Sequence, residues 1–167
     1  RKINVGYASA EALRVNFVGE LGWELHHPIE MQNYIFDQVM EAGAEFDIKP
    51  FGIRAMDSMR LEKSYRLIPR EMSIEYSAYE SGLDRFVRLD KENDFIGKKA
   101  LKHIKENNLT THKLAGIRIS DDAKPIEWYN SDFYHVFAED KKTLIGYVTS
   151  AWFSPAQGCN IAMAMLP

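Results

Sequence analysis

At 167 residues the chain is about one domain long, and an apolar fraction of 46% is enough to bury a core, which excludes an intrinsically disordered protein. The 21 basic and 24 acidic residues give a formal charge of −3, so we expect no nucleic-acid partner and no attraction to an anionic membrane. The longest apolar run, Ile161 to Leu166, is far shorter than the roughly 20 residues of a membrane-spanning helix. We therefore expect a soluble, cytoplasmic protein, with the single cysteine, Cys159, as a small buried side chain.

The first predicted element is a β-hairpin over residues 13–27. Residues 13–18 alternate apolar and polar side chains, residues 23–26 alternate again, and two glycines lie between the runs. Alternation places Glu24 and His26 on one face of the second strand, and Trp23 and Leu25 on the other.

Two amphipathic helices are predicted next. The first covers residues 29–42 and ends at Gly43, and the second begins near Pro50 and runs to about Ser64. On the second helix Arg54 and Asp57 are three residues apart, close enough to pair.

The remainder changes from mixed to all-β character. Residues 65–80 are expected to form an ordered loop, 83–89 a strand and 97–106 a short helix. Strand-like runs separated by turns follow at 114–119, 133–137, 144–148 and 160–165. We expect an α+β fold with domains 1–108 and 109–167.

The common catalytic and metal-binding motifs are missing. There is no Gly-rich phosphate loop, nucleophile elbow or cysteine pair. His26 and His27 are adjacent in a predicted strand, where neighbours point to opposite faces, so we expect no metal site.

Several blocks carry a family resemblance. Residues 17–24 read Phe-Val-Gly-Glu-Leu-Gly-Trp-Glu and residues 52–62 read Gly-Ile-Arg-Ala-Met-Asp-Ser-Met-Arg-Leu-Glu. With residues 75–87, 94–101 and 146–163, these blocks resemble the folate-binding aminomethyltransferase family of the glycine cleavage T-protein. The residues of these blocks look most similar to the branch of the family that is fused to dimethylglycine and sarcosine dehydrogenases.

The resemblance implies three ligand-binding residues for tetrahydrofolate. Glu24 falls on the acidic residue that holds the pterin ring, Arg54 on a folate-binding arginine, and Phe17 on a position where many members have tyrosine. From the residues alone, Glu24 could instead be an ordinary solvent-facing strand residue, and Arg54 a partner of Asp57.

Besides Phe17, two further positions depart from the family pattern. Arg85 stands where the T-protein has a pocket tryptophan, and Glu127 stands where a family arginine contacts the folate tail. These departures bear on whether folate binding is retained.

The resemblance implies the C-terminal half of a tetrahydrofolate-dependent one-carbon transferase acting on glycine or methylated-glycine amines. The family's catalytic aspartate would lie upstream of Arg1, so the chain alone is expected to be inactive and to need the N-terminal half as its partner. The expected fold is an antiparallel sheet with flanking helices, then a truncated C-terminal β-barrel, and its open cleft would favour self-association. Alternatives are a demethylase of a sulfonium or quaternary amine, and a non-catalytic folate-binding module.

Overall fold

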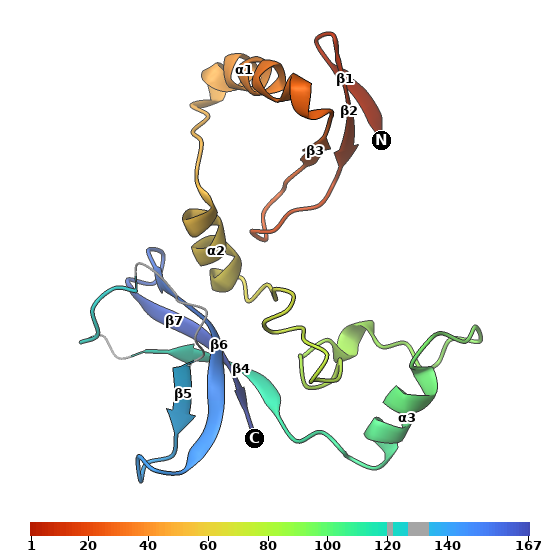
Figure 1. Ribbon diagram of the computed structural model, residues 1–167, viewed down its shortest axis with the longest axis vertical. Coiled ribbons are helices and arrows are strands. Elements are labelled where there is room, and N and C mark those ends of the chain that lie inside the picture. Colours follow the sequence, from red (N-terminus) through yellow and green to blue (C-terminus); the bar gives the residue numbers. More distant parts are fainter. Residues whose placement is uncertain (120–121, 127–133) are drawn as a thin grey trace. The chain divides into compact units, whose positions relative to one another are not determined.

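The computed structural model describes residues 1–119, 122–126 and 134–167. The start of the strand predicted at 133–137, and Glu127, lie outside the described residues. The chain divides into two compact units, Arg1–Met59 and Arg60–Pro167. Two antiparallel sheets with helices confirm the expected α+β class (Figure 1).

Unit 1 is built on a three-stranded antiparallel sheet. Its strands are β1 (Lys2–Val5), β2 (Ala8–Leu13) and β3 (Glu24–His26), in that order. On β2 the buried residues Ala8, Ala10 and Ala12 alternate with exposed ones. This period of two gives the sheet one packed face and one face open to solvent.

The predicted hairpin is correct in its second strand and wrong in its first. The chain pairs β2 with β3 through Leu13↔Glu24 and Glu11↔His26, so the first strand ends at Leu13, where the prediction began it. Residues 14–23 form an irregular loop. The buried residues of β2 are alanines, whose methyl side chains are too small to give a clear alternation of apolar and polar residues. The sequence pattern therefore does not predict this strand.

The helices of unit 1 follow the prediction closely. A short 3-10 helix, η1 (Ile29–Met31), leads into α1 (Gln32–Gly43), and η2 (Ala44–Phe46) follows. Gly43 does not end the helix through a left-handed backbone: its φ is −83°, and the left-handed residue is Asp47 at 53°. Instead, a Cβ at Gly43 would lie 2.7 Å from the Ile48 side chain, so glycine allows the chain to fold back closely.

The helix α2 (Ile53–Glu62) is shorter than the predicted 50–64, and its last residues belong to unit 2. Residues 65–80 contain no helix or strand, as predicted. The strand predicted at 83–89 is wrong, because the 3-10 helix η3 (Asp84–Phe86) occupies this segment. Leu83, Phe86 and Val87 have helical rather than alternating spacing, which accounts for the difference.

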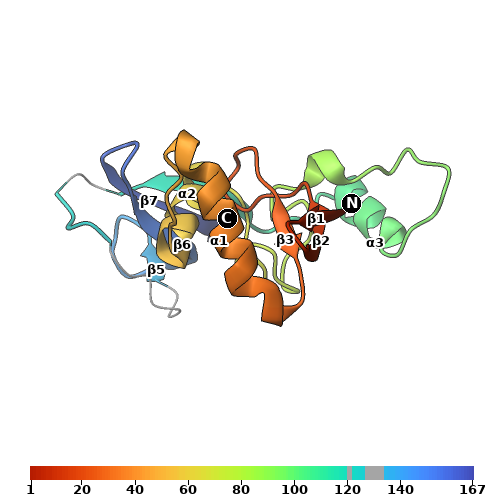
Figure 2. The ribbon, with the colours of Figure 1, turned by 90° about the horizontal axis from the view of Figure 1, so that it is seen from above.

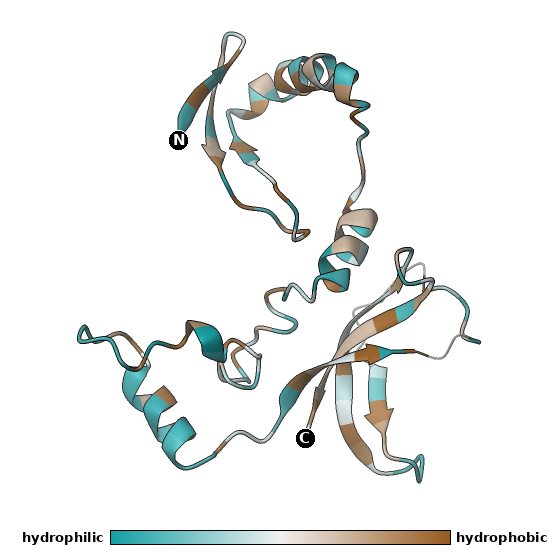
Figure 3. Ribbon diagram, turned by 180° about the vertical axis from the view of Figure 1, so that it is seen from behind, coloured by the Kyte–Doolittle hydropathy of each residue, from teal (hydrophilic) through white to brown (hydrophobic). Residues whose placement is uncertain are grey.

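The predicted helix near residues 97–106 is confirmed as α3 (Lys98–Glu106). It lies away from the four-stranded sheet of unit 2 in both views (Figures 1 and 2). Its surface is mainly hydrophilic (Figure 3).

The second sheet has the order β4-β7-β6-β5. Its strands are β4 (Lys113–Arg118), β5 (Tyr134–Phe137), β6 (Leu144–Ser154) and β7 (Cys159–Leu166). All neighbours are antiparallel. The strands confirm the all-β prediction, although β6 runs six residues past the predicted end at Val148, because Thr149 and Ser150 interrupt the apolar run without ending the strand.

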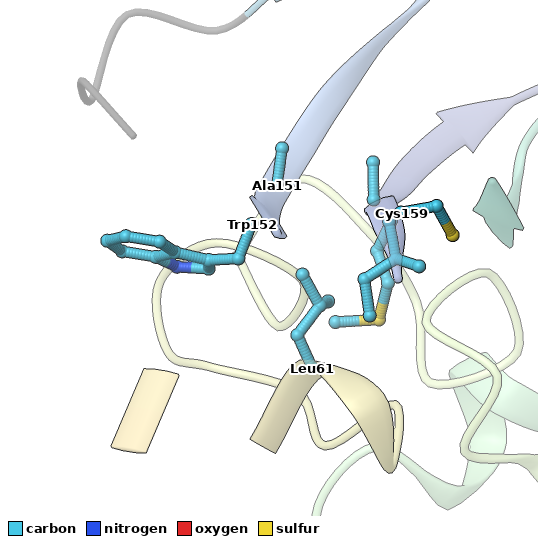
Figure 4. Close-up of a cluster of buried hydrophobic side chains, with 7 residues drawn as sticks. Leu61, Ala151, Trp152 and Cys159 are labelled. Carbon is cyan, nitrogen blue, oxygen red and sulfur yellow. The ribbon is translucent and has the colours of Figure 1, made fainter. Parts of the chain in front are cut away.

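The core of unit 2 lies where the end of α2 meets β6 and β7. Leu61 projects toward side chains of both strands, with Ala151 and Trp152 on β6 and Cys159 on β7 (Figure 4). Cys159 is 3% exposed, which confirms it as a buried side chain.

Candidate functional site

Glu24 is the first residue of β3 and stands on the open face of the unit 1 sheet. Its side chain is 51% exposed, and His26 Nε2 lies 3.1 Å from its Oε2. Because an ionised carboxylate can only accept, the imidazole must carry a hydrogen on Nε2 and donate it. The predicted sharing of one face by Glu24 and His26 is confirmed.

The prediction for the opposite face is only half correct. Leu25 is half-buried within β3, but Trp23 precedes the strand and is 59% exposed. Because Trp23 is outside the ladder, strand alternation does not fix the direction of its side chain.

Phe17 lies half-buried in the loop of residues 14–23 that leads to Glu24. The loop is closed locally, since Gly19 N–H donates to Asn16 Oδ1 at 2.6 Å. A Cβ at Gly22 would lie 2.8 Å from the Asn16 Cβ, so glycine permits this close approach. The sequence therefore sets the path by which the chain enters β3.

Arg54 lies on α2 and is exposed. The structure thus puts Phe17 and Glu24 in one continuous segment and Arg54 on a separate helix. The direct contact it reveals at Glu24 is with His26, which sequence reasoning did not assign to the site. Strand alternation already placed His26 beside Glu24 and could have suggested it.

Arg85, one of the three departures from the family pattern, lies on η3. Its guanidinium carbon is 4.7 Å from the centre of the Phe86 ring, a cation–π geometry. Phe86 is itself 64% exposed. The pair therefore places a positive charge over an exposed aromatic ring.

Unit 2 contains a buried polar cluster that the sequence did not reveal. Arg60 donates to Ser150 Oγ at 2.7 Å, to the Tyr65 carbonyl at 3.0 Å and to Glu71 Oε2 at 3.4 Å. Glu71 also accepts from Ser150 Oγ at 2.5 Å and from Leu67 N–H at 2.8 Å. The Arg60 and Glu71 side chains are fully buried, so their bonds hold the fold rather than a ligand.

A second buried carboxylate, Glu80, joins two segments of unit 2. It accepts from the backbone and hydroxyl of Ser77 at 2.9 and 2.8 Å, and from those of Thr111 at 3.0 and 3.1 Å. Burial raises the pKa of Glu80, but these four bonds outweigh burial and lower the pKa to about 2. Glu80 is therefore a structural anion.

Unit 2 also has a cavity of about 1040 Å³, a size suited to a small organic ligand. Tyr147 Oη donates to Tyr76 Oη at 2.6 Å on its wall, and the His112 ring lies edge-on to Tyr76 at 5.9 Å. Burial, and then the bond to Tyr76, raise the pKa of Tyr147, so its hydroxyl stays protonated. None of these residues was singled out from the sequence.

Within the residues that the structure describes, no three His, Cys, Asp or Glu side chains gather as metal ligands would. None of the helices in that part of the chain is long and apolar enough to cross a bilayer.

Comparison with known proteins identifies the family. Residues 1–91 match the model of the GCVT N-terminal domain, and residues 112–167 match that of the glycine cleavage T-protein C-terminal barrel domain. Human mitochondrial dimethylglycine dehydrogenase is 35% identical over all of this chain, which spans 18% of that protein. An aminomethyltransferase of Thermoanaerobacter pseudethanolicus is 36% identical over 99% of the chain, which spans 43% of that enzyme.

The fold agrees with these matches. Aminomethyltransferase T of the Bartonella henselae glycine cleavage system superposes with a TM-score of 0.74 at 23% identity. The superposition covers 93% of this chain and 41% of that structure. The chain spans less than half the length of each of these relatives, and it belongs to the glycine cleavage T-protein (GCVT) family.

Proposed function

We propose that the chain supplies the tetrahydrofolate-holding part of a one-carbon transferase that moves an aminomethyl or methyl group from an amine. The observation that carries this proposal is Glu24, a carboxylate at the start of β3 on an open sheet face. Family membership supports the same reading, since an aminomethyltransferase is among the relatives.

The chemistry of Glu24 suits a pterin. The pterin edge presents two adjacent donors, the 2-amino group and N3–H, and a carboxylate presents two acceptor oxygens. One oxygen of Glu24 contacts His26, which leaves the other oxygen and remaining lone pairs for the ligand. When bound, tetrahydrofolate supplies the N5 nitrogen that accepts the one-carbon unit.

Arg54 and Phe17 have secondary roles in this proposal. The Arg54 guanidinium can donate to a pterin carbonyl or to the glutamate-tail carboxylate, which a lysine cannot match with the same forked geometry. Phe17 offers an aromatic face for stacking but lacks the hydroxyl of a tyrosine. This chain's share of the reaction is binding and orientation of the folate.

In this proposal the residues that contact the amine donor, and the catalytic aspartate, belong to the N-terminal half of the longer protein. We propose glycine or a methylated glycine as the amine class, in keeping with the family resemblance. A second candidate for the longer protein is a dehydrogenase fused to this region, favoured by the similarity to dimethylglycine dehydrogenase over the whole chain.

The test is calorimetric titration of tetrahydrofolate into the protein as its gene encodes it. Glu24→Gln replaces one acceptor with a donor facing a donor, and we expect affinity to fall by roughly tenfold or more. Glu30→Gln is the matched control, because Glu30 is an exposed carboxylate on the neighbouring η1 and should bind no folate. Equal affinity in the wild type and Glu24→Gln would remove Glu24 from the site.

A further inference from the structure

A row of polar side chains crosses the open face of the unit 1 sheet. The register aligns Lys2 with Glu11, and Glu11 with His26. Side chains directly opposite one another in neighbouring strands share a face, with Cβ atoms about 5 Å apart. His26 therefore has two carboxylates as neighbours: Glu24 two residues back on β3, and Glu11 across on β2.

His26 contacts Glu24 in this arrangement, with Nε2 3.1 Å from Oε2. Both side chains are more than half exposed, at 58% and 51%. An exposed pair of this kind adds little to folding stability. The contact does limit the directions in which the Glu24 carboxylate can point, because one of its oxygens is held by a donor on the same strand.

We propose that His26 is a positioning residue for Glu24 and pre-orients that carboxylate toward the ligand. This inference rests on the proposed function, in which Glu24 accepts hydrogen bonds from the pterin edge. A carboxylate already held in one orientation loses less side-chain freedom on binding, so the ligand binds more tightly for the same contacts. Of the two neighbouring carboxylates, Glu24 is the one that His26 contacts.

The adjacent histidine provides a matched control. His27 Nδ1 lies 2.9 Å from the Pro28 carbonyl, so its ring contacts the backbone there and not the Glu24 carboxylate. Substituting His26 or His27 removes an imidazole in both cases, from adjacent positions in the chain. An effect confined to His26 cannot then come from loss of an imidazole in general.

The experiment compares tetrahydrofolate affinity by calorimetry in His26→Phe, His26→Gln and His27→Phe. The phenyl ring keeps the planar shape without a donor, and we expect about a twofold to fivefold loss of affinity. The glutamine amide can donate to Glu24 from a similar reach, so it should recover most of the loss. His27→Phe should bind as the wild type does, and thermal melts of all three variants should match the wild type.

A double substitution separates positioning from an independent effect. If His26 acts only through Glu24, Glu24→Gln with His26→Phe should bind no more weakly than Glu24→Gln alone. Additive losses would overturn the proposal, as would unchanged affinity in His26→Phe or a loss that the glutamine fails to rescue.

Failure of the inference and failure of the proposed function give different results. A large loss in Glu24→Gln with none in His26→Phe rejects His26 alone. No loss in Glu24→Gln rejects both.

Discussion

Two glutamates in this chain show how the surroundings of a carboxylate decide its role. Glu71 in unit 2 is fully buried and accepts from Arg60, Ser150 and Leu67. Glu24 in unit 1 is half-exposed and, within the described residues, has a side-chain hydrogen bond with His26 alone. The acceptors of Glu71 are used by the fold, whereas those of Glu24 remain available, which separates a structural carboxylate from a ligand-binding one.

The largest expected effect on stability comes from substitution of the buried carboxylate, Glu71. Glu71→Leu leaves the Arg60 guanidinium buried without its anion, and we expect unfolding in urea to lose about 3–5 kcal/mol. Combining this change with Arg60→Met removes both charges and should restore much of the loss. An equal loss in the double variant would show that shape, not charge, makes Glu71 essential.

Low pH should lower the stability of unit 2 by protonating Glu80. Its pKa falls from an ordinary 4.5 to about 2 in the folded state, so its contribution is complete above pH 4.5 and is lost as pH falls toward 2. The shift corresponds to roughly 3 kcal/mol. Urea unfolding from pH 5 to pH 2.5 measures the loss, and Glu80→Gln should flatten this part of the profile. If Glu80→Gln kept the wild-type dependence of unfolding free energy on pH, the acid sensitivity would come from other groups.

A smaller effect is expected at Ser150. Its hydroxyl links Arg60 to Glu71, and Ser150→Ala leaves one bond of each unmade, at a cost of about 1–3 kcal/mol. Ser73→Ala is a control, because that hydroxyl accepts only from an exposed backbone N–H. Chemical denaturation should separate the two, and equal stabilities would mean that water replaces the Ser150 hydroxyl.

The smallest effect on stability belongs to Glu24. Glu24→Gln removes a half-exposed contact, and we expect the free energy of unfolding to change by less than about 0.5 kcal/mol. A loss as large as that of Glu71→Leu would make Glu24 a structural residue and remove the contrast between the two glutamates.

Local patterns in the sequence predicted much of this fold. The helices α1 and α3 lie where their periodicity indicated, and the strands β4 and β7 lie where apolar runs between turns indicated. The faces of Glu24 and His26 also follow from alternation along β3. The domain boundary near residue 108, by contrast, stays a prediction.

The misses have physical causes. The strand β2 buries only alanines on its packed face, so its pattern is faint. Arg60 meets Glu71 and Ser150 across 11 and 90 residues of chain, and no local pattern encodes such a meeting. The contact between Glu24 and His26 depends on side-chain rotamers, which spacing leaves open.

The single cysteine allows the opening of the unit 2 core to be measured by thiol labelling. Cys159 lies beside Leu61 and Trp152, out of reach of a thiol reagent while that core stays closed. Labelling therefore proceeds only through molecules in which β7 has separated from its neighbours, and its rate gives the frequency or the population of that opening. Because unit 1 has no thiol, its unfolding leaves no label, and the labelling rate of Cys159 reports the opening of the unit 2 core separately from motions of unit 1.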